Sequence, residues 1–146
     1  MIKHKNYRHI IPVQIRFSDV DRLQHVNNAC YLNYFELGRV TYFRDVFKNK
    51  INWNKEGFIL ARTELNHLQP VFLNDEIYCC TRIKSFGNKS MVVQNAIIKF
   101  HKGEVVECAE GTGVLVAMNY AKQVSKKIPA PWKKAMQDFE NENKFF

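Results

Sequence analysis

Apolar and polar residues alternate along several stretches of this chain, and the alternation predicts strands. In residues 10–17 (IIPVQIRF), the apolar side chains from Val13 to Phe17 fall on one face, which is the two-residue period of a half-buried strand. Pro12 has no backbone N–H to donate. We therefore expect this strand to start at the edge of a sheet or outside its hydrogen-bond ladder.

A different pattern follows at residues 28–48 (NACYLNYFELGRVTYFRDVFK), which contain no proline and repeat apolar residues at helical spacing. The apolar positions cover most of the circumference, so we expect a helix that other structure wraps on most sides. Such a helix would be about 30 Å long. Gly38 in its middle costs about 1 kcal/mol relative to alanine, which indicates that another element approaches the helix closely there.

After a loop, the pattern predicts four further strands, at residues 58–71, 75–86, 91–100 and 105–118. Gly103 lies in a tight turn between the last two, which is a good hairpin signal. Gly111 and Gly113 on the last strand indicate close packing against another backbone. Residues 130–144 are predicted to form a C-terminal helix that starts near Pro131.

The order is therefore strand, long helix, then a meander of four strands. Segregation of helix and strands favours an α+β fold with an antiparallel sheet. We expect a curved sheet of about five strands wrapped around one long buried helix. A chain of 146 residues fits a single domain, with a core at about 8–120 and a C-terminal basic segment and helix at about 121–146.

Composition places the chain among ordinary globular proteins, with 46% hydrophobic and 25% charged residues. No stretch approaches the ~20 apolar residues of a membrane span, and no apolar block follows the basic N-terminus as in a signal peptide. The cysteines are Cys30, Cys79, Cys80 and Cys108, and none forms a CxxC pair. We expect reduced, mostly buried thiols in a cytoplasmic protein, with no metal site.

The net charge of +8 suits an anionic partner, such as nucleic acid, an anionic membrane surface, a phosphorylated cofactor or an acidic protein. An excess of charge also serves solubility alone. Late in the chain five lysines occur with no acidic residue between them: Lys122, Lys126, Lys127, Lys133 and Lys134. Base-stacking aromatic residues are not interleaved with these lysines, so no nucleic-acid partner is expected.

Residues 19–28 (DVDRLQHVNN) carry the candidate chemistry. Asp, His and Asn are common in turns, and Asn27 can cap a helix that begins near Asn28. The end of that helix also offers unsatisfied N–H groups and a partial positive charge, which can hold a developing oxyanion. The loop places Asp21 and His25 within reach of that point. A carboxylate there can attack a carbonyl or activate water, and a thioester suits it because a thiolate leaves with little acid assistance.

The stretch RFSDVDRLQHVNNACYLNYFELGR resembles the hotdog-fold acyl thioesterases, in particular the 4-hydroxybenzoyl-CoA thioesterase-like family, and also the plant acyl-ACP thioesterases. The pattern is matched at Asp21, His25, Asn27, Asn28 and Tyr31. Two later stretches, TELNHLQPVFLNDEIYCCTRI and GNKSM, resemble the family's second strand and next hairpin. The resemblance covers about residues 8–120 and implies the hotdog fold.

The resemblance also implies roles for the loop residues. Asp21 matches the catalytic carboxylate, as nucleophile or general base. His25 matches a histidine of the acyl-ACP branch, and Asn28 stands where a helix N-terminal amide polarises the thioester carbonyl. This chain has Leu23 where the acyl-ACP branch has asparagine, so a plant-type catalytic network is incomplete here. Asp19 is expected to cap or orient the loop.

Substrate-binding roles are implied for Asn27 and Tyr31 beside the catalytic loop. Lys89 and Ser90 align with a hairpin that lies near the nucleotide phosphates in relatives. The family's site lies at a dimer interface, so a homodimer or homotetramer is expected, without a cofactor. His67 in an alternating strand is expected to be structural.

These features together predict an acyl-CoA thioesterase of fatty acid metabolism that releases a free acid and the CoA thiol. Two alternatives remain open at this point. One is an acyl-ACP thioesterase, whose acidic carrier protein would suit the positive charge. The other is a non-catalytic acyl- or nucleic-acid-binding module.

Overall fold

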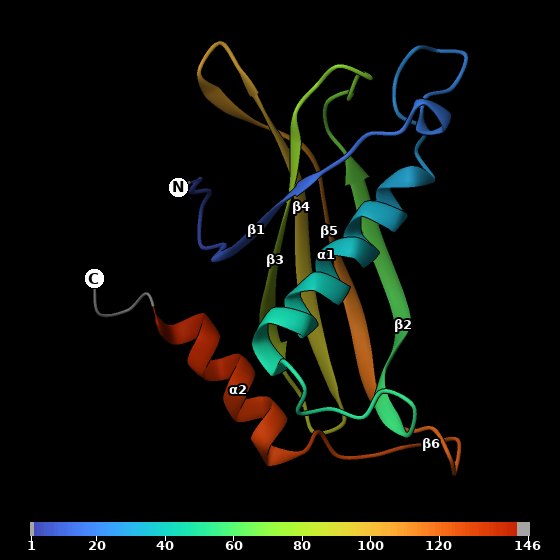
Figure 1. Ribbon diagram of the computed structural model, residues 1–146, viewed down its shortest axis with the longest axis vertical. Helices are drawn as coiled ribbons and strands as arrows, with labels where there is room; N and C mark the ends of the chain where they lie inside the picture. The colour runs from blue at the N-terminus through green and yellow to red at the C-terminus, as the bar shows by residue number, and fades with distance from the viewer. Residues whose placement is uncertain (1, 143–146) are drawn as a thin grey trace.

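The computed structural model describes residues 2–142, in which an antiparallel sheet lies against one long helix (Figure 1). In chain order the elements are β1 (His9–Val13), a 3-10 helix η1 (Phe17–Asp19), α1 (Cys30–Phe47), β2 (Glu56–His67), β3 (Ile77–Phe86), β4 (Ser90–His101), β5 (Glu104–Asn119), β6 (Val124–Ser125) and α2 (Ala130–Asn141). Five long strands follow the order β1-β3-β4-β5-β2, and β6 pairs with β5. The predicted α+β class is confirmed, as is a curved antiparallel sheet with one long helix.

Element boundaries differ from the prediction where side chains redirect the backbone. The first strand ends at Val13, and Phe17 begins η1 with 85% of its surface exposed. The prediction of a strand up to Phe17 is therefore wrong. The Asp19 carboxylate accepts the Arg16 N–H, which turns the chain away from the sheet. Pro12 lies on β1, which is an edge strand, and pairs with Tyr78 of β3. An edge position is what the missing N–H of proline predicts.

The start of α1 lies two residues later than predicted, with Ala29 as the N-cap residue and no side-chain cap bond. Asn27 therefore does not cap the helix directly. Its Oδ1 accepts the Ala29 N–H at 2.9 Å, so it satisfies an amide just before the helix begins. The C-terminal helix ends at Asn141 in the described chain, and predicted residues 143–144 lie outside the described residues.

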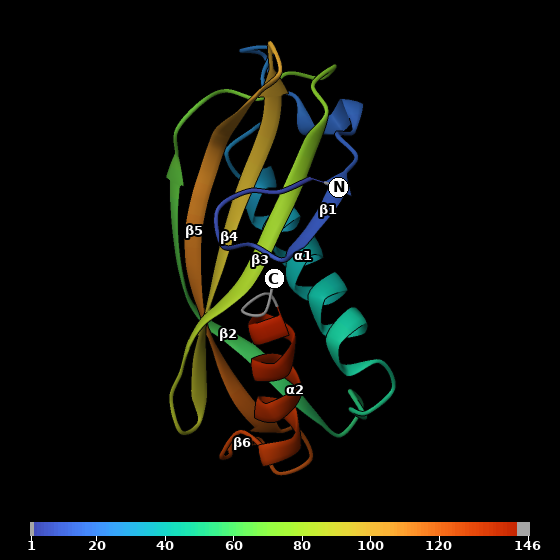
Figure 2. The same cartoon turned by 90° about the vertical axis from the view of Figure 1, so that its left-hand side faces the viewer.

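The long helix is less completely buried than its composition predicts. Both helices lie on one face of the sheet (Figure 2), and α1 buries Tyr34, Phe35 and Tyr42 there. On its remaining face, Leu37 and Val40 are 44% and 58% exposed. The single sheet covers one side of α1, and no strand of residues 2–142 covers the opposite side. The prediction of a helix wrapped on most sides is wrong to that extent.

Two glycines allow the helix and strands to approach closely, as predicted. A Cβ on Gly38 would lie 2.6 Å from both Cys79 Sγ and Thr81 Oγ1, so α1 rests directly on β3. A Cβ on Gly111 would overlap the Glu64 carbonyl oxygen of β2 and lie 2.8 Å from the Phe35 ring. The helix and the edge strand β2 therefore pack tightly around this point of β5.

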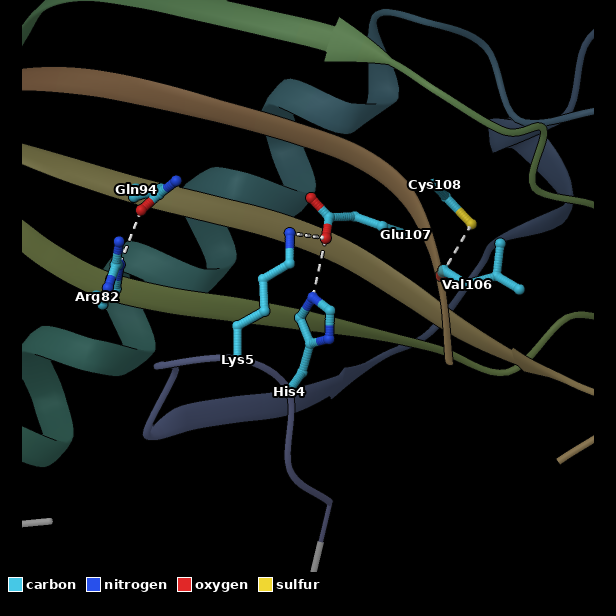
Figure 3. Close-up of polar contacts among 7 residues, drawn as sticks. All are labelled: His4, Lys5, Arg82, Gln94, Val106, Glu107 and Cys108. Atoms are coloured by element: carbon cyan, nitrogen blue, oxygen red, sulfur yellow. Dashed lines mark hydrogen bonds and ion pairs between the residues drawn. The ribbon is translucent and has the colours of Figure 1, made fainter. Parts of the chain in front are cut away.

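The outer face of the sheet is partly covered by the N-terminal segment. His4 and Lys5 both reach the Glu107 carboxylate, with His4 Nε2 at 2.9 Å and Lys5 Nζ at 2.7 Å (Figure 3). Tyr7 is buried against Cys80 in the same layer. All four cysteines are free thiols, three of them buried, which agrees with the expectation of reduced thiols.

Replacing Gly111 with alanine is expected to destabilise the fold by roughly 2–3 kcal/mol, because the new Cβ meets backbone that cannot move without breaking the β2–β5 pairing. Gly113→Ala is the matched control on the same strand. Its Cβ would lie 3.0 Å from the flexible end of Leu60, so a loss of about 1 kcal/mol or less is expected. Urea unfolding measures both, and equal losses would contradict the close approach at Gly111.

Candidate functional site

Residues 19–27 form a small closed loop ahead of α1. The Asn27 N–H donates to the Asp19 carbonyl at 2.8 Å, and the Asp21 N–H donates to the His25 carbonyl at 3.2 Å. Gln24 at the tip adopts a positive φ of 69°, which a tight turn requires. These bonds hold Asp21 and His25 side by side at the loop's narrow end.

A buried carboxylate anchors this loop to the helix. Asp19 is 1% exposed, and its Oδ2 accepts hydrogen bonds from the Arg16 N–H at 3.0 Å and the Tyr34 hydroxyl at 2.7 Å. The Arg16 guanidinium lies 3.0 Å from the other oxygen. Burial alone would raise the pKa of this carboxyl, but the hydrogen bonds from Arg16 and Tyr34 outweigh it and hold the pKa of Asp19 below its usual value. Asp19 is thus a structural anchor, as expected.

A free backbone donor lies just ahead of α1. Asn27 accepts the N–H of Ala29 through its side chain and the N–H of Cys30 through its carbonyl, both at 2.9 Å. Within residues 2–142, the Asn28 N–H donates no hydrogen bond. It sits where the helix dipole is positive, so this amide is available to an oxygen that gains negative charge.

A cavity of about 230 Å³ opens at this helix end. It is lined by His25, Val26, Asn28, Tyr31, His67, Leu68, Gln69 and Pro70. Tyr31 is 3% exposed, and burial raises the pKa of its hydroxyl to about 12, so the phenol is neutral at physiological pH. The His67 ring packs edge-on against Tyr31, with the ring centroids 4.9 Å apart.

The end of β2 and the segment after it form a wall of the cavity that the sequence did not predict. His67 was expected to be structural, yet it lines the cavity together with Gln69. The N–H groups of Leu68 and Gln69 both donate to the Cys108 carbonyl, at 2.8 and 3.1 Å, which fixes this segment on β5. The alternation of side chains along a strand could have indicated this position. His67 lies two residues from Leu65 and therefore points to the same, helix-facing side of β2.

Asp21 lies beside the cavity but does not line it. Its Oδ1 accepts the Leu23 N–H at 2.9 Å. In the described part of the chain, its Oδ2 makes no hydrogen bond. The neighbouring His25 faces its own loop, with Nδ1 at 3.3 Å from the Val26 carbonyl. One carboxylate oxygen is therefore held and the other is free.

Lys89 and Ser90 are not brought to this cavity. They lie at the turn between β3 and β4, at the end of the molecule opposite the loop of residues 19–28 (Figure 1). The Lys89 carbonyl accepts the Ala117 N–H at 2.8 Å, which fixes that turn to β5. A single chain therefore cannot bring these two residues to the cavity.

Within residues 2–142, no group of three His, Cys, Asp or Glu side chains is placed to hold a metal ion. No helix in this part of the chain is long and apolar enough to cross a membrane.

The sequence matches known proteins over most of its length. A family model described as "Thioesterase-like superfamily" matches residues 15–139. The uncharacterised protein YsmA of Bacillus subtilis is 27% identical over 120 residues, which cover 80% of this chain and 75% of YsmA. The long-chain acyl-CoA thioesterase FadM of Escherichia coli is 24% identical over 116 residues, which cover 77% of this chain and 86% of FadM.

Solved structures share the fold. A thioesterase from Thermus thermophilus, complexed with coenzyme A and Zn, superposes with a TM-score of 0.81 at 29% identity, covering 94% of this chain and 98% of that chain. A mutant 4-hydroxybenzoyl-CoA thioesterase complexed with 4-hydroxybenzoyl-CoA gives a TM-score of 0.79 at 15% identity, covering 87% and 96%. The second likeness concerns the fold alone.

Asp19→Asn is expected to lower the free energy of unfolding by about 2 kcal/mol at pH 7, because Tyr34 and Arg16 lose an ionised partner. The contribution of Asp19 is fully present above about pH 3.9, its pKa in the unfolded chain. It is lost as pH falls through the lower pKa of the folded state. The stability difference between wild type and variant should therefore shrink below about pH 4. Chemical unfolding between pH 7 and pH 2 measures it.

Tyr34→Phe is the matched control, since it removes one hydrogen bond to the same oxygen and leaves the charge. We expect a loss of about 1 kcal/mol and a pH dependence close to that of the wild type. A constant difference between wild type and Asp19→Asn over the whole pH range would contradict a lowered Asp19 pKa.

Proposed function

Since this chain belongs to the thioesterase-like superfamily and is a thioester hydrolase, we propose that it hydrolyses an acyl-CoA to a free acid and coenzyme A. One observation carries the proposal. Asn28, whose N–H donates no hydrogen bond within residues 2–142, lines the cavity at the helix end, and Asp21 pairs with the cavity-lining His25. The CoA complex of the Thermus thermophilus thioesterase supports the choice of carrier.

Asn28 supplies the electrophilic part of the proposed site. Its N–H donates to the thioester carbonyl oxygen, and the bond strengthens as that oxygen becomes negative in the tetrahedral state. The helix dipole acts in the same direction. Tyr31 forms the apolar floor beneath the reacting group, and Asn27 holds the loop in place through its bond to Ala29.

Asp21 supplies the nucleophilic part. Its free Oδ2 either attacks the carbonyl carbon or removes a proton from a water molecule that attacks it. In both routes the C–S bond breaks with its electrons on sulfur, and water supplies the hydroxyl of the acid and the proton of the CoA thiol. His25 positions the loop, because its ring contacts the loop's own backbone.

A second copy of the chain completes the proposed site. β2 is an edge strand that pairs only with β5 within residues 2–142, and its Ile59 and Leu60 are 45% and 43% exposed. Such an edge is a template for pairing with another chain. Antiparallel pairing of two β2 edges would place the β3–β4 turn of one subunit near the cavity of the other. Lys89 and Ser90 would then meet the nucleotide phosphates across the interface.

The same proposal covers the whole chain as one thioesterase domain, residues 1–146. Its four free thiols suit a reducing compartment, and we propose a cytoplasmic location on that basis. The similarity to the long-chain acyl-CoA thioesterase FadM supports a proposed role in fatty acid metabolism.

Asp21→Asn is expected to lower kcat by at least about 100-fold on acyl-CoA substrates, because it removes the carboxylate that attacks or activates water. The amide oxygen still accepts the Leu23 N–H, so the loop should keep its shape. Thiol release over a panel of acyl-CoAs measures the effect. Asp138→Asn, which replaces an exposed carboxylate on α2, is the control and should retain activity. Full activity of a folded Asp21→Asn variant would refute the assignment.

An acyl carrier protein is the second candidate carrier, favoured by the net charge of +8, since such carriers are acidic. We expect kcat/KM to be at least about tenfold higher on acyl-CoA than on the matched acyl-ACP, which is a difference of ~1.4 kcal/mol. A preference in the opposite direction would replace CoA with the carrier protein and leave the roles of Asp21 and Asn28 in place.

A further inference from the structure

The excess positive charge of this protein is concentrated at one end. We define the lysine pole as residues 48–56, 87–89 and 119–134, which form the lower end of Figure 1. Backbone hydrogen bonds join the three segments, from Tyr120 to Lys55 at 2.9 Å and from Ile128 to Asn88 at 3.0 Å. The pole is therefore one continuous surface and not three separate loops.

The pole accounts for the whole net charge. It carries nine lysines and one acidic residue, Glu56, which together equal the +8 of the full sequence. In the rest of the chain 13 basic residues balance 13 acidic ones. The nine lysines are Lys48, Lys50, Lys55, Lys89, Lys122, Lys126, Lys127, Lys133 and Lys134.

Most of these lysines have no acidic partner among residues 2–142. In the described chain only Lys126, with Glu56, and Lys134, with Asp138, form an ion pair. All seven arginines of the sequence lie outside the pole. Arginine suits the bidentate recognition of single carboxylates or phosphates, whereas lysine is a mobile point charge. An all-lysine surface therefore suits an extended anionic surface.

Exposed apolar side chains lie among the lysines. Trp53, in the loop before β2, is 40% exposed, and Val124, in the short strand β6, is 50% exposed. Trp53 also borders an apolar hollow of about 410 Å³, whose rim includes Arg44 and Lys48. Tryptophan beside lysine is the combination that prefers the boundary between lipid and water.

We propose that the lysine pole binds the surface of an anionic lipid membrane. Lysines near such a surface contribute roughly 1 kcal/mol each, and Trp53 and Val124 supply shallow apolar contact. Several segments at a protruding end meet a planar surface together, while the phosphates of one CoA require only a few of these charges. The proposal does not depend on the proposed hydrolysis. It would place the enzyme where amphiphilic acyl thioesters collect.

The test is sedimentation with phosphatidylcholine vesicles, with and without about 30% phosphatidylglycerol. Wild type should bind only the anionic vesicles, and about 0.5 M salt should release it, because the Debye length falls about twofold from its value of ~10 Å at 0.1 M. The variant with Lys50→Gln, Lys122→Gln and Lys127→Gln should lose at least about tenfold in binding. All three side chains are exposed.

The matched control carries Lys3→Gln, Lys84→Gln and Lys102→Gln, which remove the same charge outside the pole. It should bind within about twofold of wild type, and both variants should hydrolyse a short, soluble acyl-CoA as wild type does. Equal loss of vesicle binding in the two variants would show a general charge effect and refute the lysine pole as the binding surface. If wild type bound no vesicles, or bound RNA but not vesicles, the proposal of membrane binding would be refuted.

Tryptophan fluorescence gives an independent readout. Trp132 is 5% exposed, so a blue shift on adding anionic vesicles must come from Trp53. Trp53→Phe keeps an aromatic ring against Phe43 and Phe58 and should abolish the shift while preserving most of the binding. A blue shift that persists in Trp53→Phe would show that Trp53 is not part of the membrane contact.

Discussion

The buried carboxylate of Asp19 is the constraint on which the site geometry depends. It lies where the chain leaves β1 and must turn back to start α1. Its Oδ2 accepts the Arg16 N–H and the Tyr34 hydroxyl, and the backbone carbonyl of Asp19 accepts the Asn27 N–H. A buried charge is tolerated only when it is paired and hydrogen-bonded, so these contacts must form together. These contacts fix where the loop that carries Asp21 and His25 begins and where it rejoins the start of α1.

The meander, the turn at Gly103 and the close approaches at Gly38 and Gly111 were predictable from the sequence, because each depends on local periodicity or on a residue type with one conformational use. The end of β1 was not. Phe17 continues the alternation perfectly, yet it is exposed, because the Asp19 carboxylate accepts the Arg16 N–H and ends the strand. The alternation of apolar and polar residues reflects side-chain polarity alone. It does not reveal a hydrogen bond that competes with strand pairing for a backbone N–H. The exposed face of α1 was misjudged for a related reason, since composition does not say how many sides a single sheet can cover.

The candidate site was only half visible in the sequence. The loop and the helix end form one contiguous stretch, so their proximity follows from chain connectivity. His67 and Gln69 reach the same cavity from β2 and the segment after it, and only the β2–β5 register places them there. Lys89 illustrates the opposite case. The resemblance associates it with the nucleotide phosphates of the substrate, whereas the fold sets the β3–β4 turn that carries it at the end of the molecule opposite the loop of residues 19–28. Sequence patterns carry roles but not distances, so a residue can match a role and still need a second subunit to fulfil it.

The separation of charge from chemistry has a further physical consequence. The loop of residues 19–28 lies in the part of the chain where acidic and basic residues balance. The lysine pole lies at the other end of α1, beyond the ~10 Å screening length of the loop within one chain. Antiparallel pairing of β2 edges would change this for Lys89 alone, because the β3–β4 turn of one subunit would then flank the cavity of the other. A single symmetric assembly would therefore reconcile two features of this chain. These are an exposed edge strand and the distance of Lys89 and Ser90 from the cavity.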